Sequence, residues 1–235
     1  MYLTFDEARE IREAFERDAT ASSYGWSRRS YAPMHSFPRL HAALRAAHPG
    51  YVVAFDVVFE SASGAMVDWH VDWESLGPWL IPDAWTAIRD SHFRSVHFNL
   101  TPAAGALHTM PAWPRLAWVY HHAIAHGGSW GGGLYGILHR VLNILCRPLF
   151  HFFAVQYPSE PRLGNAFDNM RLHAISEGEP RLSYVVRLVR HDVVFTRAAI
   201  ERSLAQSSAV APLAKMLLER LGDERDECAA CELEN

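Results

Sequence analysis

Short apolar runs separated by turn residues fill the middle of the chain, and they limit its fold more than any other feature. They are rich in β-branched and aromatic residues, which are typical of strands. The runs lie at 51–60, 65–73, 93–101, 106–110, 115–120, 149–156, 165–175, 181–189 and 192–195. Helical segments do not alternate regularly with these runs, as they would in a parallel sheet. We therefore expect a mainly β fold with flanking helices, either a sandwich or a jelly roll.

Helical patterns occur at both ends of the chain and in one insertion. Thr4 and Glu7 form a capping-box pair ahead of apolar residues at helical spacing. A second helix is expected from about 36 to 47, and two more at about 200–204 and 213–221. In the insertion, about 127–147, a glycine-rich stretch precedes apolar residues at i, i+3, i+4, i+7 and i+8. That spacing predicts an amphipathic helix packed over the barrel.

Size and composition suit one domain. The chain has 235 residues, 49% of them hydrophobic, which is enough for a sizeable core. We expect a single domain over 1–222 with a barrel core at about 51–196. We expect an acidic, disordered tail over 223–235, which includes the Cys228-x-x-Cys231 pair. The net charge of −4 offers no basic field for nucleic acid.

Several features favour a cytoplasmic protein. Three cysteines, an odd number, argue against the disulfide framework of a secreted domain. The first seven residues are acidic and lack the apolar stretch of a signal peptide. The most apolar segment, 134–153, is interrupted by charged residues and by Pro148, so we do not expect it to span a bilayer.

His70 and Asp72 are separated by one residue within a strand-like run. Residues i and i+2 of a strand point to the same side, so the imidazole and the carboxylate converge. A third ligand must come from another strand, and His173 is the best candidate. Two histidines and one carboxylate leave three coordination positions open, which suits Fe(II) and O₂ binding beside an organic co-substrate. On its own, the His-x-Asp pair also fits a strand end with a solvated carboxylate.

The run from 181 to 187 places Arg181, Ser183 and Arg187 on one side by strand parity. The alternate residues are apolar, so one of the two sides must face the core. If the arginines face inward, they require a partner, because burying an unpaired charge is costly. A bound carboxylate is the natural partner, since a guanidinium binds it through two parallel hydrogen bonds. The alternative is that the apolar side faces the core and the arginines face solvent.

The order of these motifs resembles the Fe(II)/2-oxoglutarate-dependent dioxygenase superfamily. The shared features are His70-x-Asp72, the distal His173, and Arg181-x-Ser183 on the following strand. Residues 95–102 and 105–111 are similar to the mid-barrel strand pair of that superfamily, and 165–189 to the pair that carries the distal histidine and the co-substrate arginine. The resemblance covers about 52–189. It implies a double-stranded β-helix, which is a cupin-like jelly roll.

The resemblance also implies cofactors and residue roles. It implies Fe(II) as the metal, with 2-oxoglutarate and O₂ as co-substrates. Its iron ligands would be His70, Asp72 and His173. The distal carboxylate of 2-oxoglutarate would be anchored by Arg181, with Ser183 beside it, or by Arg187. Weaker candidates are Thr109 for a second co-substrate contact, and Trp73 and Asn99 for the substrate pocket.

The implied activity is that of a 2-oxoglutarate-dependent dioxygenase that hydroxylates, desaturates or cyclises its substrate. Little surrounds the expected barrel, so a small molecule is favoured over a folded protein. A specialised metabolite or amino-acid derivative is the first choice, and an acyl or lipid substrate the second. Halogenases of this superfamily carry Gly or Ala in place of the carboxylate, so the presence of Asp72 makes halogenation unexpected.

Other readings of the chain remain open. A cupin-like barrel that binds metal without redox chemistry, such as an isomerase or a ligand-binding barrel, would share the fold but would not need the buried arginine. A catalytically silent binding module is a further alternative. Gly127-x-Ser129-x-Gly131 matches the nucleophile elbow of serine hydrolases, although no strand pattern precedes it. His122 and His126, four residues apart, could bind zinc, but no glutamate lies between them in the position of a catalytic base.

Overall fold

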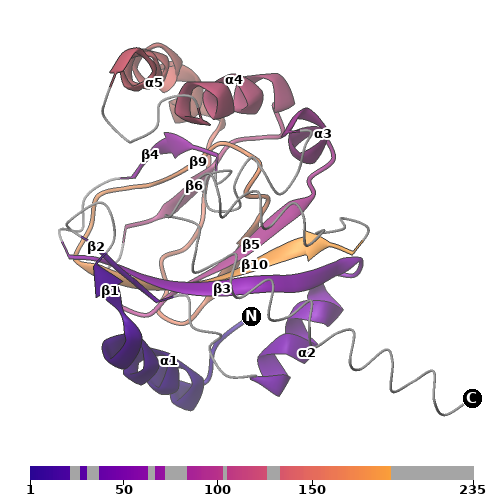
Figure 1. The fold of residues 1–235 in the computed structure, drawn as a ribbon, viewed down its shortest axis with the longest axis vertical. Coiled ribbons are helices and arrows are strands. Elements are labelled where there is room, and N and C mark those ends of the chain that lie inside the picture. Colours follow the sequence, from indigo (N-terminus) through magenta and orange to yellow (C-terminus); the bar gives the residue numbers. More distant parts are fainter. Residues whose placement is uncertain are drawn as a thin grey trace, which may run out of the picture.

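The computed structural model describes residues 1–21, 27–30, 37–62, 67–71, 84–102, 105–125 and 133–191. Within these residues the strands form two sheets, which lie between two groups of helices (Figure 1). The larger sheet has the order β1-β2-β3-β10-β5-β8, and the smaller sheet the order β4-β9-β6-β7. The strands of the larger sheet are β1 (Thr20–Ala21), β2 (Ser27–Ser30), β3 (Tyr51–Ser61), β5 (Phe93–Asn99), β8 (Gly164–Phe167) and β10 (Arg181–Arg190). Those of the smaller sheet are β4 (Val67–His70), β6 (Leu107–Thr109), β7 (Val155–Gln156) and β9 (His173–Ile175).

The strand order is that of a double-stranded β-helix. From β3 to β10 the chain crosses between the two sheets at every step except from β6 to β7. Each strand pair in both sheets is antiparallel. This wrapping of one chain around two facing sheets defines the jelly roll, so the fold expected from the sequence is confirmed.

Two helices near the N-terminus cover the outer face of the larger sheet (Figure 1). They are α1 (Phe5–Asp18) and α2 (Pro38–Ala47). Their buried side chains, among them Ile11 and Leu40, pack in one cluster with outward residues of β3, β5 and β10. The capping box expected at the start of α1 is present, with the backbone amide of Glu7 donating to the hydroxyl of Thr4 and the Thr4 amide donating to the Glu7 carboxylate.

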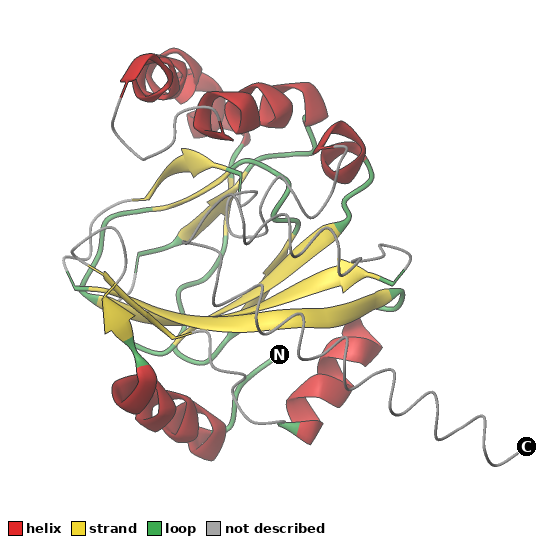
Figure 2. Ribbon diagram, viewed as in Figure 1, coloured by secondary structure: helices red, strands yellow, loops and turns green. Residues whose placement is uncertain are grey.

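Three further helices lie on the side of the smaller sheet, as Figure 2 shows in red above the short strands. They are α3 (Ala84–Arg89), α4 (Pro114–Ala125) and α5 (Gly133–Phe153). A second apolar cluster joins α3, α4 and α5 to the outer face of the smaller sheet. Within it the ring of Trp69, on β4, stacks on that of Phe150, on α5, with 4.4 Å between centroids.

Two of the expected strands are wrong. Residues 115–120 belong to helix α4, which begins at Pro114. A short apolar run fits either a buried strand or a helix, and a proline at the first helical position favours the helix. Residues 149–153 continue helix α5, which runs through Pro148, and strand β7 covers only Val155–Gln156. The insertion helix itself is confirmed, although it is longer than expected.

The run expected at 165–175 is two strands in different sheets. Strand β8 ends at Phe167 in the larger sheet, and β9 begins at His173 in the smaller one. Between them the carboxylate of Asp168 accepts a hydrogen bond from the amide of Met170, which closes a tight turn. The strand expected at 192–195, the helices expected at 200–204 and 213–221, and the tail at 223–235 lie outside the described residues.

We predict that Glu7→Gln lowers the free energy of unfolding by about 1 kcal/mol at neutral pH, since it weakens both the capping box and an ion pair with Arg39. Burial raises the pKa of Glu7, but hydrogen bonds from Arg39 and Thr4 outweigh this effect and the pKa is lowered. Ionised Glu7 therefore stabilises the folded state at pH values above the pKa that this carboxyl has in the unfolded chain. This stabilisation is lost as the pH falls through the pKa of Glu7 in the folded state.

Urea denaturation of both proteins from neutral pH to about pH 3 measures this difference. The two unfolding curves should converge as the pH falls. Glu10→Gln is the matched control, because Glu10 is exposed on the same helix. Equal losses for the two variants would show that the contacts of Glu7 contribute nothing specific.

Candidate metal centre

His70 and His173 face each other across the β4–β9 pair of the smaller sheet. They are register partners, one at the end of β4 and the other at the start of β9. Their ring centroids are 4.2 Å apart and both side chains are buried. The sequence analysis assigned both histidines to one metal site, His70 through the His-x-Asp motif and His173 as the best candidate from another strand, and the structure brings the two together.

Backbone hydrogen bonds orient both imidazole rings. The Nδ1 atom of His70 lies 2.7 Å from the carbonyl oxygen of Asp68, and that of His173 lies 2.9 Å from the carbonyl oxygen of Arg171. A carbonyl oxygen only accepts, so each Nδ1 carries the proton and each Nε2 carries the lone pair. Metal-binding histidines are held in this way, with the second ring nitrogen donating to a carbonyl or carboxylate.

The third expected ligand, Asp72, lies outside the described residues, as does Trp73. Its neighbour Val71 is described, and Val71 packs in the apolar cluster under α4 and α5, on the opposite side of the sheet from His70. Among the residues that the structure describes, no three His, Cys, Asp or Glu side chains are close enough to hold one metal ion. The role of Asp72 therefore stays a prediction.

The histidines point into the space between the two sheets. The ring of His173 lies 4.9 Å from that of Phe167, which is on β8 of the facing sheet. Phe167 belongs to a small apolar cluster with Leu107 and Ile175 of the smaller sheet. Thr109 is the register partner of His173 on β6 and is also buried. The barrel interior is therefore partly apolar beside the two histidines.

The arginines of β10 face the barrel interior, which settles the choice left open by strand parity. The alternate residues Leu182, Tyr184, Val186 and Leu188 pack outward against the cluster under α1 and α2. Arg181 and Ser183 are 1% and 0% exposed, and Arg187 is also buried. Burial lowers the pKa of Arg181 below the usual arginine value, because the charged form loses its hydration.

Polar residues form rows across the inner face of the larger sheet. Ser183 pairs with Asn99, and Arg187 pairs with Ser95 and donates a hydrogen bond to its hydroxyl. The Nδ2 atom of Asn99 donates to Ser159 at 2.9 Å. Among the described residues, the buried hydroxyl of Ser183 has no hydrogen-bond partner. On the inner face, this hydroxyl could form a hydrogen bond with a ligand.

Two further polar residues of the inner face were not singled out from the sequence. His97 and Asn165 are register partners on β5 and β8, and both are buried on the inner face. His97 follows Ser95 and precedes Asn99 at alternate positions of one strand. This polar alternation within a mostly apolar run could have identified the whole inner row.

The competing sites gain no support from the described residues. A nucleophile elbow at Ser129 requires a preceding strand, but the residues up to Ala125 form helix α4. Ser129 and His126 lie outside the described residues, and so does the side chain of His122.

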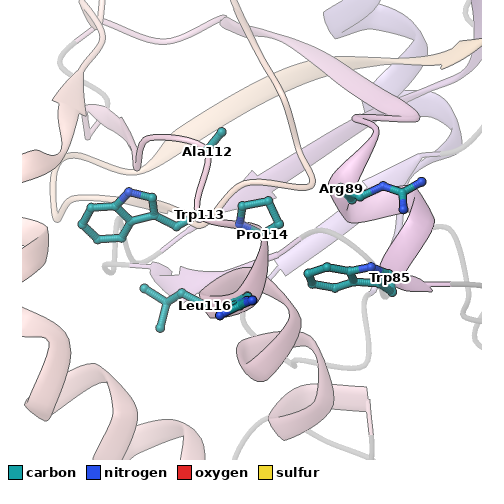
Figure 3. A pocket seen from close by; sticks show the side chains of 7 residues that line it. Trp85, Arg89, Ala112, Trp113, Pro114 and Leu116 are labelled. Atoms are coloured by element: carbon teal, nitrogen blue, oxygen red, sulfur yellow. The ribbon is translucent and has the colours of Figure 1, made fainter.

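A pocket of about 460 Å³ lies between α3 and the start of α4. Figure 3 shows Trp85 and Arg89 of α3 on one side of it and Trp113 on the other. The complete lining is Trp85, Arg89, Ala112, Trp113, Pro114, Arg115 and Leu116. None of the candidate ligands named above lines it.

No protein-family model and no curated protein sequence matches the chain. Solved structures do resemble it. HygX from Streptomyces hygroscopicus, with nickel, 2-oxoglutarate and hygromycin B bound, is 12% identical with a TM-score of 0.48, over 81% of this chain and 81% of that one. The epimerase SnoN, in complex with Fe³⁺, α-ketoglutarate and nogalamycin RO, is 14% identical with a TM-score of 0.48, over 82% of this chain and 78% of that one.

An oxidoreductase of the 2OG-Fe(II) oxygenase family from Burkholderia pseudomallei is 10% identical with a TM-score of 0.43, over 82% of both chains. At identities and TM-scores this low, the likeness extends to no particular residue, substrate or reaction. The double-stranded β-helix is established by the strand order of the chain itself.

Proposed function

We propose that the chain is an Fe(II)- and 2-oxoglutarate-dependent oxygenase that acts on a small molecule. The observation that carries the proposal is the pair of oriented histidines on one sheet of the barrel, with a buried arginine and a buried serine on the inner face of the other sheet. The histidines offer nitrogen ligands to a divalent metal, and the arginine offers a site for a carboxylate. A dicarboxylic keto acid that bridges a metal and a guanidinium uses both.

The residues present fit the metal. His70 and His173 would bind it through Nε2, the atoms that carry the lone pairs when Nδ1 donates to backbone carbonyls. Asp72 would supply the carboxylate, since it follows His70 at the spacing described above. This set of two histidines and one carboxylate would leave coordination positions open for the co-substrate and for O₂.

The residues on β10 fit the other end of the co-substrate. We assign its distal carboxylate to Arg181 and Ser183, which lie two residues apart on the inner face and are almost completely buried. A carboxylate there would accept hydrogen bonds from the serine hydroxyl and from the guanidinium in a region of low dielectric. Arg187 lies on the same face and donates a hydrogen bond to Ser95, and it is the second candidate for the anchor.

When bound, iron and 2-oxoglutarate supply the oxidation of a substrate carbon by O₂, coupled to the formation of succinate and CO₂. The role of the protein is to bind and orient both groups and to limit the access of water to them. Phe167, which lies beside His173 and packs with Leu107 and Ile175, supplies apolar surface for this purpose. Hydroxylation, desaturation and cyclisation of a specialised metabolite are the outcomes we propose. A non-redox cupin-like metalloprotein, the second candidate, would form no succinate.

We predict that His70→Ala and His173→Ala each weaken Co(II) binding by more than the ~10–100-fold that loss of an outer-shell partner costs. Isothermal titration calorimetry with Co(II) in place of Fe(II) measures this directly. His108→Ala is the control, because His108 alternates with Thr109 on β6 and contacts Trp69 on the outer face. Parental affinity in either variant would remove that histidine from the ligand set. Asp72→Ala tests the third ligand in the same assay.

A second prediction concerns the co-substrate. With Fe(II), O₂ and ascorbate, the parent protein should slowly convert 2-oxoglutarate to succinate without substrate. Arg181→Leu should raise the KM for 2-oxoglutarate at least about thirtyfold, because loss of one partner of a buried charge pair costs roughly 2–5 kcal/mol. A serine-to-alanine change at Ser183 should act in the same direction, with a smaller effect.

Arg190→Leu is the matched control, since Arg190 lies on the same strand at the opposite parity. Arg187→Leu is measured beside it. A larger effect at position 187 than at 181 would move the anchor to Arg187. Normal KM values in both variants would refute the proposed co-substrate site, and the absence of succinate from the parent protein would favour the non-redox candidate.

A further inference from the structure

Helix α5 exposes a long apolar face to solvent. Its residues include Ile144, Leu145 and Phe152, which are 71%, 69% and 78% exposed. The other large exposed apolar residues of the helix are Ile137, Leu138, Val141, Leu149 and Phe153. Between 137 and 153 the helix is about 24 Å long, at 1.5 Å per residue. Continuous apolar surface of this extent marks an interaction site on a folded protein.

The exposed face is not the side by which α5 packs on its own domain. Leu142, Cys146 and Phe150 hold the opposite side of the helix against the cluster over the smaller sheet. His139, on that side, is buried and its Nε2 lies 2.8 Å from the carbonyl oxygen of Trp69. Helix α5 is therefore apolar on two sides, of which the fold uses one. In Figure 1 the helix lies at the edge of the molecule, farthest from α1 and α2.

The charged side chains of helix α5 are of one sign. Arg140 and Arg147 are exposed and lie two turns apart along one edge of the apolar face, and His151 follows one turn later on the same edge. The sequence contains no Asp or Glu anywhere from 91 to 159, although the chain has 26 acidic residues and a net charge of −4. A helix face that is apolar, with a cationic edge and no acidic residue on the helix itself, complements a lipid surface, which has an apolar interior and can carry anionic headgroups.

We propose that helix α5 binds an anionic lipid surface, lying in its plane with Ile144, Leu145 and Phe152 inserted and Arg140 and Arg147 at the headgroups. An antiparallel contact with a second copy of the chain fits less well, because its two-fold axis would place the arginine edges of both copies on the same side. Within the described residues no helix is sufficiently long and apolar to cross a bilayer. In this proposal helix α5 therefore lies at the bilayer surface. Its contact with lipid is independent of the metal centre.

The test is co-sedimentation of the full chain with vesicles of phosphatidylcholine containing about one third phosphatidylglycerol. The parent protein should bind these vesicles, and bind pure phosphatidylcholine more weakly. Ile144→Glu and Phe152→Glu should each lower the partition coefficient about tenfold or more, as expected when one large apolar side chain no longer inserts. The double variant Arg140→Gln, Arg147→Gln should bind the anionic vesicles more weakly than the parent protein. Its remaining binding should also depend less on salt concentration.

Phe5→Glu is the matched control, because Phe5 is 76% exposed on α1 at the other end of the molecule, and an acidic residue suits the first turn of a helix. It should bind like the parent, and so should His70→Ala, whose loss of metal leaves α5 unchanged. Failure of the parent to bind anionic vesicles overturns the proposal. So does sedimentation equilibrium that shows a stable dimer dissociated by Ile144→Glu, since a second copy would then cover the face.

Discussion

Strand β10 is the element on which the rest of the structure depends. It pairs with β3 along its whole length and with β5 along most of it, so it forms the centre of the larger sheet. Its alternation gives the sheet two different faces. Leu182, Tyr184, Val186 and Leu188 hold α1 and α2 outside, while Arg181, Ser183 and Arg187 line the interior. A shift of one residue in register would exchange these faces, removing the outer core and the candidate anchor together.

The main apolar core is consequently not between the two sheets. One large cluster lies under α1 and α2 on the outer face of the larger sheet. The other lies under α3, α4 and α5 and also includes Phe93 and Val189 at one end of the larger sheet, whereas a separate cluster between the sheets has three buried members, Leu107, Phe167 and Ile175. In an ordinary sandwich the inner faces supply the core. Here the helices supply the burial that the interior does not, which leaves space between the sheets for histidines, asparagines and arginines.

The sequence predicted the parts of this arrangement that depend on strand parity. Alternation in 181–187 placed the arginines together, and the pairing of His70 with His173 followed from the His-x-Asp motif and the resemblance. It failed where the local pattern was ambiguous. The run 115–120 is apolar enough for a strand, but tertiary packing under α5 makes it helix α4. The change of sheet after Phe167 depends on the turn at Asp168, which apolar periodicity does not record.

Helix α5 has two apolar sides with different roles. Its inner side covers the smaller sheet through Phe150 and Trp69, so it keeps β4 in place and with it His70. Packing on that side needs only one apolar stripe. The second stripe adds nothing to the core, and leaving it in water has a free-energy cost that grows with its area. A helix that supports the metal-binding strand with one side and offers a partner the other can bring the barrel to a surface without any change in the site itself.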